Sequence, residues 1–475
     1  MHDFVRQLLR GSDIAIFAYF VALNSSCLVL IGPAAAGFAR QLRRAAFAGT
    51  DDMFRSPLTP PVSVIVPARD EGAAIVPAVL AMTALRYPRY EVVVVDDGST
   101  DDTFERLREQ FDLVEVPRVM PGEVPYRSEV IAVFVARADP ETLTVVRKTA
   151  GGRADAVNVG INLARHPLIC MVDADALLDP DALLSVTKPI GDDPLRVAAC
   201  GGMMRIANGC RVVGGRVVDV RMPRGWPARI QVVEYLRAFL MSRTGWSRAG
   251  GPVVISGALR VFRRDLVVRV GGMDPQTVGE DAELMVRLHR HLRERGEDYR
   301  TVFVAEPVGW SEAPSSMRAL GRQRRRRHRG IAEILGRHRG MIFRPRYGRV
   351  GMVALPYYLI FELLAPFVEL AALILLPLGL WASAVDAAFG WRFVLVAYGY
   401  GLLVSLTALF VHRGPRWTDI LRGVGAAALE NFGYRQILAL WQVAGALGAG
   451  RGREAVRGTT NRSGFEMVGA GHRPD

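Results

Sequence analysis

The chain has 475 residues, a net charge of +13 that is carried almost wholly by arginine, and a hydrophobic fraction of 50%. Its mean hydropathy of +0.18 is high for a soluble protein and predicts membrane segments beside one large α/β domain. The positive charge suits anionic phosphate in a nucleotide, a lipid headgroup or a nucleic acid. Four cysteines without CxxC pairing or histidine partners indicate neither a disulfide scaffold nor a zinc site, and a reducing cytosolic compartment fits.

An apolar segment from Ile14 to Ala39 predicts a first transmembrane helix, because it is long enough to cross a hydrocarbon core of roughly 30 Å. No small-residue cleavage site clearly ends it, which favours a retained anchor over a removed signal peptide. Arg40, Arg43 and Arg44 follow the segment directly. By the positive-inside rule, these arginines place the next residues in the cytoplasm.

Residues 51–315 alternate short β-branched runs with helical stretches, which predicts a parallel sheet flanked by helices. Two buried strands, Val62–Val66 and Val92–Val95, each end in a polar loop. Ligands of open α/β sheets gather at the carboxyl ends of the strands, so both loops are expected to face one crevice. This arrangement favours a nucleotide pocket.

A third apolar strand ends at Asp173 and Asp175, with only Ala174 between them. Residues i and i+2 that leave a strand project to the same side, so these carboxylates can chelate one hard cation that also bridges a diphosphate. An Asp-rich turn that caps a helix and a calcium loop are the alternatives. A calcium loop would need an oxygen ligand at Leu177 and a glycine at Leu178, and this sequence has neither.

The run RQRRRRHRG, Arg322–Gly330, lies in a predicted amphipathic helix from about Ser316 to Met341. We expect its solvated arginines to attract anionic lipid at roughly 1 kcal/mol per residue near the surface. The run carries no interleaved aromatic residue and no nucleic-acid-binding motif, so we expect no nucleic acid partner. The side chains assigned to lipid are Arg322, Arg324, Arg325, Arg329, Arg337, His338 and Arg339.

Two further apolar segments, Val350–Val385 and Trp391–Val411, predict two more spans. Prolines in the first segment predict kinks or a lead-in along the interface. Glu362 and Glu369 within it are costly in lipid and should face protein or a water-filled path. Residues 423–450 are apolar but carry charged and amide side chains, which predicts an interfacial helix.

Seven motifs occur in order along the chain, each weak alone: VSVIVPARDE, VVVVDDGSTDDT, GGRADAVNVGI, MVDADALLDPDAL, SGALRVFRRDLVVRVGGMDPQTVGEDAELMVRLHR, WSEAP and QRRRR. Taken together, they resemble a family 2 inverting glycosyltransferase of the membrane-embedded cellulose, hyaluronan and chitin synthase type. The resemblance covers roughly Val62 to Gly348 and extends into the following span. It implies an α/β fold of the GT-A (Rossmann-like) type, a UDP-sugar donor and a Mg²⁺ or Mn²⁺ cofactor.

The resemblance and the hydropathy together divide the chain into five parts. They are an N-terminal transmembrane anchor (1–50), a cytoplasmic GT-A catalytic domain (51–315), an amphipathic interfacial helix with a Gln-x-x-Arg motif (316–349), a transmembrane region (350–415), and an interfacial helix with a cytoplasmic tail (416–475). We therefore expect an integral protein of a bacterial-type inner or plasma membrane.

The resemblance implies donor contacts at several positions, and Asp173 and Asp175 would bind the metal against the diphosphate. Asp97 would hold the uracil and ribose end, with an ordinary strand-end turn as the alternative. Arg153 falls where relatives commonly carry Lys near the phosphates, and Asn158 follows on the same helix, with a plain surface helix start as the alternative. The nucleotide-sugar contacts are Pro67, Arg69, Glu71, Asp97, Arg153, Asp173, Gln323 and Arg326.

The reaction needs a base, because an acceptor hydroxyl must lose its proton as the bond to UDP breaks. The resemblance implies that this base is Asp281. Acids at a helix N-terminus also stabilise the helix dipole without any catalysis, which is the alternative. Glu280, Ser256 and Gly257 are implied at the acceptor site. Gly279 stands where many relatives have Thr.

Relatives carry Gln-x-x-Arg-Trp on the interfacial helix, and Gln323 and Arg326 match its first two polar positions. The Trp, which stacks on the acceptor sugar, is replaced by Arg327. A guanidinium gives less apolar stacking area than an indole, which weakens the expected grip on a growing chain. Trp310 and Trp246 are other candidates for stacking.

Three functions stay open on the sequence. The first is a processive transferase that extends a polysaccharide and passes it through its own spans. The second transfers a single sugar to a lipid or short glycan, and the third is a non-catalytic UDP-sugar-binding subunit. Three spans and the missing Trp favour a short product or an export partner that completes the channel. Expected partners are thus a UDP-sugar, a glycan or lipid-linked acceptor, and the lipid membrane.

Overall fold

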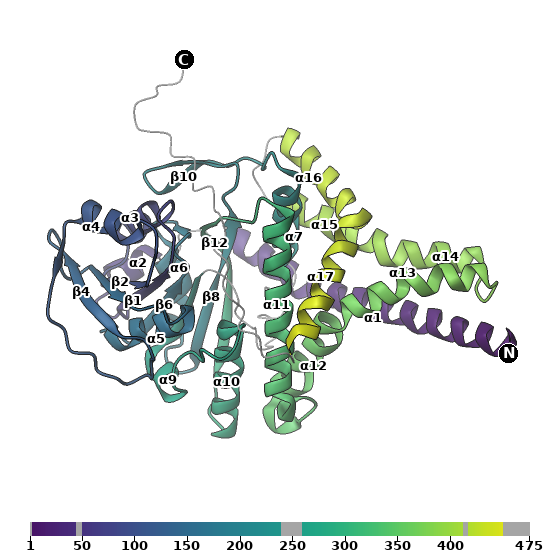
Figure 1. Ribbon diagram of the computed structural model, residues 1–475, viewed down its shortest axis with the longest axis horizontal. Helices are drawn as coiled ribbons and strands as arrows, with labels where there is room; N and C mark the ends of the chain where they lie inside the picture. The colour runs from purple at the N-terminus through teal and green to yellow at the C-terminus, as the bar shows by residue number, and fades with distance from the viewer. Residues whose placement is uncertain (1, 44–49, 239–258, 412–416, 450–475) are drawn as a thin grey trace, which may run out of the picture.

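The computed structural model describes residues 2–43, 50–238, 259–411 and 417–449 of the chain. An α/β domain built on one large sheet lies on one side of the molecule, and a bundle of long helices projects from the other side (Figure 1). Helices α11 (Met317–Arg337) and α17 (Arg435–Gly448) stand side by side between the two parts.

The centre of the sheet consists of parallel strands that are buried on both faces. Strand β1 (Val62–Ala68) pairs in parallel with β2 (Tyr90–Asp97) and with β6 (Leu168–Val172), and β2 pairs in parallel with β5 (Leu143–Lys148). Their continuous apolar sequences are typical of strands covered by helices on both sides. These elements confirm the three strands predicted from the sequence, each with its polar loop at the carboxyl end.

The sheet as a whole is mixed rather than parallel throughout, which corrects the predicted arrangement. Strand β11 (Leu259–Arg263) runs antiparallel between β6 and β8 (Val197–Ile206), and β12 (Arg300–Ser311) is parallel to β8. Antiparallel strands also close both ends of the sheet: β3 (Leu113–Glu115) and β4 (Val130–Ala136) at one, β7 (Leu177–Leu178) at the other. The full order is β3-β4-β5-β2-β1-β6-β11-β8-β12-β7.

Two hydrophobic cores lie on the two faces of this sheet. One contains side chains of α3 (Ile75–Thr83), α4 (Thr103–Phe111) and α6 (Ala182–Asp192). The other contains side chains of α5, α7, α9 and α10. The bounds of these helices, with the small elements near the sheet, are α2 (Thr50–Arg55), α5 (Arg153–Leu163), α7 (Trp226–Arg237), α9 (Arg264–Arg269), α10 (Glu280–Glu294), β9 (Arg211–Val213) and β10 (Arg216–Asp219).

Helix α11 begins at the serine that the sequence predicted: the side chain of Ser316 caps it by accepting a hydrogen bond of 3.3 Å from the backbone N–H of Ala319. Helix α17 packs along it through two glycines. A Cβ at Gly321 would meet the ring of Trp441, and one at Gly445 would collide with the backbone of Arg325. Helix α17 therefore covers one side of the helix that was predicted to lie on the membrane.

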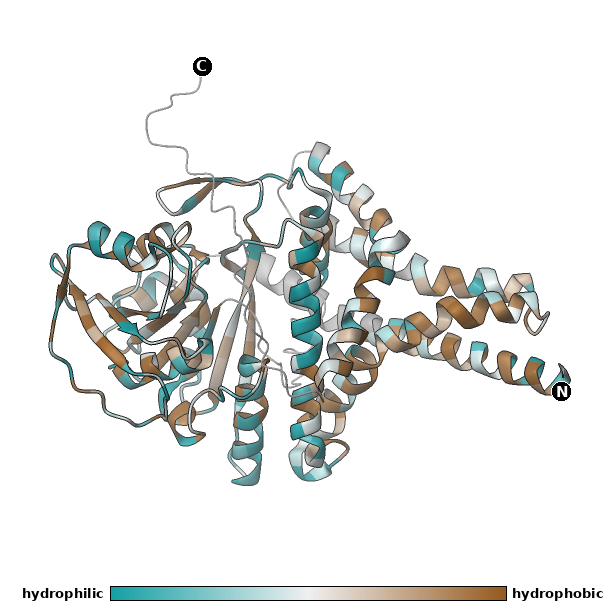
Figure 2. Ribbon diagram, in the orientation of Figure 1, coloured by the Kyte–Doolittle hydropathy of each residue, from teal (hydrophilic) through white to brown (hydrophobic). Residues whose placement is uncertain are grey.

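Two apolar runs of the bundle, Val350–Trp381 and Ala387–Thr407, are long and apolar enough to cross a membrane by length and composition. Only 11% of the most apolar 18-residue window in Val350–Trp381 is buried. Figure 2 shows the long helices of the bundle coloured largely as hydrophobic. Their segments are η4 (Val350–Ala354), α12 (Leu355–Tyr357), η5 (Tyr358–Leu363), α13 (Ala365–Trp381), α14 (Ala387–Val394), η6 (Leu395–Gly399) and α15 (Tyr400–Val411), where η4, η5 and η6 are π-helical.

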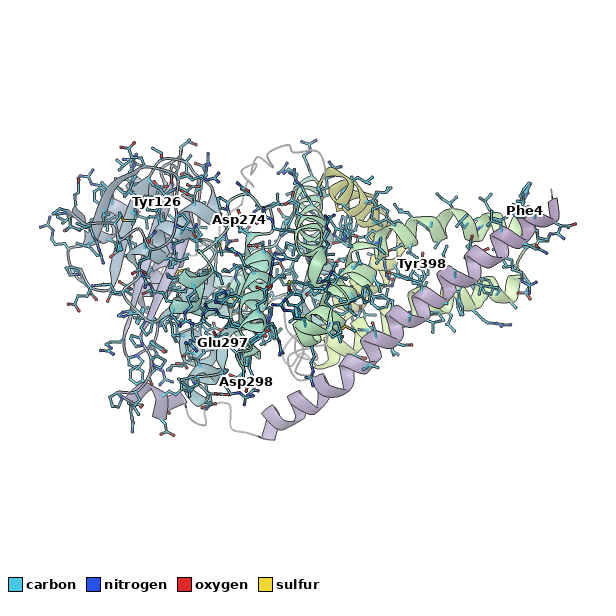
Figure 3. All side chains as sticks on the ribbon, turned by 90° about the horizontal axis from the view of Figure 1, so that it is seen from below. Phe4, Tyr126, Asp274, Glu297, Asp298 and Tyr398 are labelled. Atoms are coloured by element: carbon cyan, nitrogen blue, oxygen red, sulfur yellow. The ribbon has the colours of Figure 1, made fainter. Side chains whose placement is uncertain are left out.

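The N-terminal helix α1 (His2–Arg43) contains the predicted first span and packs against both apolar runs. Tyr19 donates a hydrogen bond of 2.6 Å to the carbonyl of Ile360 in η5, and Asn24 donates one of 2.7 Å to the carbonyl of Val396 in η6. Phe4 lies at the far end of the bundle and Tyr398 in its middle (Figure 3). The polar side chains of α1 thus satisfy carbonyls where the other helices are distorted.

Both acids of the first apolar run face protein, as expected. Glu369 pairs with Arg435 at 3.1 Å, and Glu362 lies 3.9 Å from Arg327. The apolar segment after the last predicted span forms α16 (Trp417–Leu429), η7 (Glu430–Tyr434) and α17. In η7, Glu430 pairs at 2.6 Å with Arg237 of α7, which ties the bundle to the α/β domain.

Candidate active site

Two loops at the carboxyl ends of β1 and β2 are hydrogen-bonded to each other. The backbone N–H of Glu71 donates to Thr103 Oγ1 at 2.9 Å, and Asp70 Oδ1 accepts from the N–H of Thr100 at 2.7 Å. Asp70 adopts the left-handed conformation (φ 53°), which Asp and Asn tolerate better than other residues. Pro67 is buried in β1, whereas Arg69 beside it is exposed.

Asp97 holds protein atoms rather than facing the crevice. Its carboxylate pairs with Lys148 and accepts hydrogen bonds from the N–H groups of Gly151 (2.8 Å) and Gly152 (2.9 Å). Only 2% of Asp97 is exposed. Asp97 therefore fixes the loop that leads into α5 and so positions Arg153, and its expected contact with uracil and ribose stays a prediction.

Asn158 is likewise structural, and its helix is buried rather than on the surface. Its amide oxygen accepts from the N–H of Met273 at 2.7 Å, while its amide nitrogen donates to the carbonyls of Met273 (2.9 Å) and Pro125 (3.0 Å). These bonds use both ends of the amide. Asn158 therefore joins α5 to the segment before α10 and is not available to a ligand.

Arg153 begins α5 and connects three carboxylates that lie far apart in the sequence. It donates to Asp173 at 2.7 Å, to Asp281 at 2.8 Å and to Glu280 at 3.2 Å. The arginine side chain is 5% exposed, whereas Asp173 and Asp281 remain 36% and 26% exposed. The predicted donor-side acid and the predicted base thus occupy one cluster at the carboxyl edge of the sheet, and both acids reach solvent.

A second arginine, Arg260 of β11, also belongs to this cluster. It pairs with Asp281 and is 1% exposed. The predicted site did not include Arg260. The neighbouring Arg263 and Arg264 pair with exposed acids at the surface, Asp265 and Glu123. The sequence feature that could have indicated Arg260 is a charged residue inside the otherwise apolar strand sequence LRVF.

The two arginines determine the charge of the acids. Burial by itself would raise the pKa of Asp281, but the charges of Arg153 and Arg260 outweigh it and hold that pKa well below its ordinary value. Burial would also raise the pKa of Asp173, but the charge of Arg153 lowers it, and the pKa of Asp173 is lowered overall. Both carboxylates are therefore ionised at neutral pH.

The two aspartates of the D-x-D motif differ in exposure, although the sequence predicted that they project alike. Asp173 reaches solvent, whereas Asp175 is 2% exposed. Among the described residues, no three His, Cys, Asp or Glu side chains are grouped so that they could hold a metal ion. Mg²⁺ is commonly bound by one or two carboxylates with substrate phosphates, and this donor set fits that arrangement.

Helix α11 brings one predicted donor contact to the cluster. Arg326 Nη2 lies 3.8 Å from Glu280, and Gln323 is exposed one turn earlier on the same helix. Arg327 points elsewhere, towards Glu362 of the first apolar run. The replaced Trp position therefore lies at the boundary between the catalytic domain and the bundle.

The start of α10, which carries the predicted base, is fastened to α11. A Cβ at Gly330 would lie 3.0 Å from the Cα of Gly279, so the two backbones touch. Glu333 accepts from the N–H of Val278 at 3.0 Å, and the two helices meet again where His338 lies 3.4 Å from Glu283. Gly279, where relatives carry Thr, is thus the residue that lets α11 approach this closely.

Three of the six arginines predicted to bind lipid pair with protein acids instead, which corrects the expected role of these three. Arg324 pairs with Glu234 of α7, and Arg329 pairs with Glu333 at 2.7 Å. Arg337 pairs with Asp274, which Figure 3 places beside α10. Arg322, Arg325 and Arg339 are exposed, whereas His338 is buried.

The expected acceptor residues are only partly placed. Ser256, Gly257 and Trp246 lie outside the described residues. Trp310 is buried in β12, where its indole N–H donates to Asp179 at 3.3 Å and the guanidinium of Arg205 lies over its ring. Trp310 therefore packs within the domain.

Comparison with known families agrees with this geometry. The model described as "Glycosyltransferase like family 2" matches residues 60–330, which is more than half of the chain and contains the whole carboxylate–arginine cluster. The chain belongs to glycosyltransferase-like family 2. This membership confirms the predicted family and the α/β glycosyltransferase fold class.

Curated relatives include poly-β-1,6-N-acetyl-D-glucosamine synthases. Those of Staphylococcus aureus strain COL and of Staphylococcus epidermidis are each 24% identical over 274 residues, which is 58% of this chain and 55% of theirs. The chain thus spans about half the length of the curated relatives it matches. Among solved structures, the mannosyltransferase PcManGT of Pyrobaculum calidifontis, with GDP-Man and Mn²⁺, aligns at a TM-score of 0.47 with 20% identity, covering 91% of this chain and 98% of that one.

Proposed function

We propose that this protein is a membrane-bound inverting glycosyltransferase that moves a sugar from a UDP-sugar to a glycan during polysaccharide synthesis. The observation that carries the proposal is the contact of Arg153 with both Asp173 and Asp281, which joins the donor-side acid and the candidate base. Membership in glycosyltransferase-like family 2 supports the reaction class. The name of the curated relatives supports a polymeric product.

In the proposed reaction an acceptor hydroxyl attacks the anomeric carbon of the donor sugar. The bond from that carbon to the diphosphate oxygen breaks, and its electron pair leaves with UDP. Asp281 takes the hydroxyl proton, for which it is ionised and partly exposed. Attack from the face opposite the leaving group inverts the anomeric configuration.

The chain's own residues would prepare this step through an exchange of ion pairs. A diphosphate competes for Arg153, because guanidinium groups bind phosphate in bidentate geometry. Loss of that contact would make Asp281 a stronger base, while Arg260 still holds it in place. Arg326 of α11, with Gln323, would close on the diphosphate from the other side.

Asp173, with Asp175, would hold Mg²⁺ or Mn²⁺. When bound, such a cation neutralises charge on the leaving diphosphate. The accessible carboxylate of Asp173 supports this assignment, and phosphate oxygens of the donor would complete the ligand set. Glu280, between Arg153 and Arg326, is proposed to face the acceptor.

We further propose that α1 and the two apolar runs cross the membrane with the α/β domain in the cytoplasm. Exposed tryptophans support this placement, since Trp381 and Trp391 flank the turn between α13 and α14 and are 85% and 74% exposed. Tryptophans are enriched at membrane–water interfaces. Three spans make a narrow bundle, so a polymer would need an export partner to complete a channel.

Membranes that contain the full chain, incubated with a panel of radiolabelled UDP-sugars and divalent cation, test the proposal. We expect one UDP-sugar to be consumed, with label entering a glycan whose size gives the product class. Membranes with Asp281→Asn should consume none. Equal consumption by both preparations would refute the assigned base, and consumption of no UDP-sugar by either would refute the proposed donor class.

Transfer of a single sugar to a lipid or short glycan is the second candidate. The observation that favours it is the pairing of Arg327 with Glu362, because this arginine replaces the aromatic residue that relatives use to hold a chain. Product sizing in the same experiment separates the two candidates. A labelled product that is extracted into organic solvent and carries one sugar would favour the second.

A further inference from the structure

The turn that joins α11 to the first apolar run, residues 339–349, is rigidly built. It contains the short helical turns η2 (Arg339–Met341) and η3 (Pro345–Tyr347). Met341 and Tyr347 are buried beneath it, and the Tyr347 hydroxyl donates to Glu294 at 3.0 Å. Buried contacts thus fix the backbone of this juxtamembrane turn.

Phe343 stands out of the turn in an unfavourable conformation. Its ring is 57% exposed, and its φ of 57° lies in the left-handed region, which bulky residues rarely adopt. The N–H of Phe343 donates to the carbonyl of Gly351 at 2.9 Å, so the backbone is held there. Glycine or asparagine would take this conformation at lower cost. The packing of the turn therefore gives no reason for an aromatic ring at this position.

Three arginines lie in the same turn as Phe343. Arg339, Arg344 and Arg346 are exposed, and within the described residues no ion pair of 4.0 Å or less joins any of them to an acid. The charge of Arg346 reaches Glu294, but that carboxylate already accepts from Arg290 and Tyr347. The guanidinium groups of Arg339, Arg344 and Arg346 are thus open to an external anion.

The position of the turn identifies the source of that anion. Val350, the next residue after the turn, begins the candidate span Val350–Trp381, so the turn lies at the boundary of any membrane that the span crosses. In Figure 1 it lies at the foot of α11, beside α12. Arginines next to a span attract anionic lipid, and an aromatic ring among them can enter the layer beneath the headgroups.

We propose that the juxtamembrane turn binds the phosphate headgroup of an anionic phospholipid through Arg344 and Arg346, with Arg339 beside them and Phe343 inserted below the headgroup. The surface follows the end of α11, and of the side chains that the sequence assigned to lipid it retains Arg339. It does not depend on sugar transfer, and it concerns residues outside the carboxylate–arginine cluster.

Binding of phosphatidylglycerol and of neutral phosphatidylcholine to the full chain, purified in a neutral detergent, tests the proposal by native mass spectrometry. The wild type should prefer phosphatidylglycerol. Loss of the two positive charges should weaken the binding of phosphatidylglycerol by about one order of magnitude. We therefore expect Arg344→Gln with Arg346→Gln to lower that affinity at least tenfold without changing the binding of phosphatidylcholine. Arg89→Gln with Arg108→Gln is the matched control, because both residues are exposed on the catalytic domain.

Three results would overturn the proposal. In the first, the Arg344/Arg346 variant binds phosphatidylglycerol as tightly as the wild type does. In the second, the wild type binds the two lipids with equal affinity. In the third, inorganic phosphate displaces the lipid at similar concentrations, which would indicate a general anion site. An acidic protein that binds the turn in place of lipid would give the second result.

Phe343→Gly and Phe343→Asn separate a role in lipid binding from a role in folding. Both residues suit the left-handed backbone, so thermal stability in detergent should be unchanged or higher. The affinity for phosphatidylglycerol should fall about threefold through loss of the ring. A lower melting temperature with unchanged lipid affinity would show that the ring is structural and would overturn its assignment.

Discussion

The carboxylate–arginine cluster and the ion pairs of the helix bundle both match buried acids with arginines, but they do so differently. In the cluster, Arg153 serves three carboxylates and Asp281 serves two arginines. Among the described residues of the bundle, Glu369 forms an ion pair only with Arg435, and Glu430 only with Arg237 of α7. A shared arginine can give up one contact and keep others, whereas a single pair is either made or broken. The cluster is therefore suited to exchange ligands and the bundle pairs to hold structure.

The strongest test of this contrast is Asp281→Asn in the cluster. Turnover should fall by about 10²–10⁴-fold or more, because the amide cannot take the acceptor proton. Binding of UDP, measured by calorimetry with divalent cation, should stay near the wild-type value. Asp298→Asn is the control, since Asp298 is 73% exposed and lies in the turn before β12. A turnover within twofold of the wild type would remove Asp281 as the base.

Arg153→Lys tests whether the contacts of Arg153 with three carboxylates contribute to catalysis beyond its positive charge. Lysine keeps the positive charge but cannot present a planar fork to three carboxylates and a diphosphate. We expect kcat/KM to fall about 10–100-fold while the melting temperature changes little. If kcat/KM is unchanged, the shared geometry has no catalytic role. Arg89→Lys, at an exposed position, is the matched control.

In the bundle, Glu369→Gln should destabilise the protein by leaving Arg435 without its partner. We expect a loss of about 1–3 kcal/mol, because the pair is partly exposed and a fully buried pair would lose more. The double variant Glu369→Gln with Arg435→Gln should recover most of the loss. Additive losses in thermal melts would show that the two side chains do not interact.

Gly279→Thr restores the family residue and tests the contact between α10 and α11. A side chain at Gly279 would lie 3.0 Å from Ile334 and 3.3 Å from the Cα of Gly330, so α11 must shift by a few tenths of an ångström. We expect kcat to fall about tenfold with a smaller change in KM, because small displacements of positioned groups reduce rates. Gly336→Thr on the open side of α11 is the control.

The smallest expected effect on rate comes from Arg327→Trp, which removes the contact with Glu362 and restores the family side chain. The consumption of UDP-sugar should change by less than about threefold, since exposed ion pairs contribute little. The size distribution of the product should shift to longer chains. An identical distribution would show that this position does not control product length.

The sequence predicted the features that depend on residues close together in the chain. The strands that end at Asp97 and Asp173, the helix that starts at Glu280 and the cap at Ser316 all follow from hydrophobic pattern and cap chemistry, and they are where the sequence placed them. The loop role of Asp97 was missed, because its partner Lys148 lies on another strand and nothing near Asp97 indicates it.

Two of the acids that pair with arginines of α11 could not be identified from the sequence. Periodicity allows the i,i+4 pair of Arg329 with Glu333 within α11, but it does not indicate Glu234 of α7 or Asp274, which precedes α10. Arg260 was missed for a related reason. A lone charge in an apolar strand predicts a buried partner, and only the tertiary fold identifies that partner as Asp281.

The hydrogen bonds of α1 have a consequence for the order of assembly. Tyr19 and Asn24 are made early in synthesis, but the carbonyls that accept from them belong to Ile360 and Val396, more than 340 residues later. During translation these polar groups therefore cannot meet those carbonyls until the whole catalytic domain has been made. The bundle closes last, after the catalytic part has been synthesised.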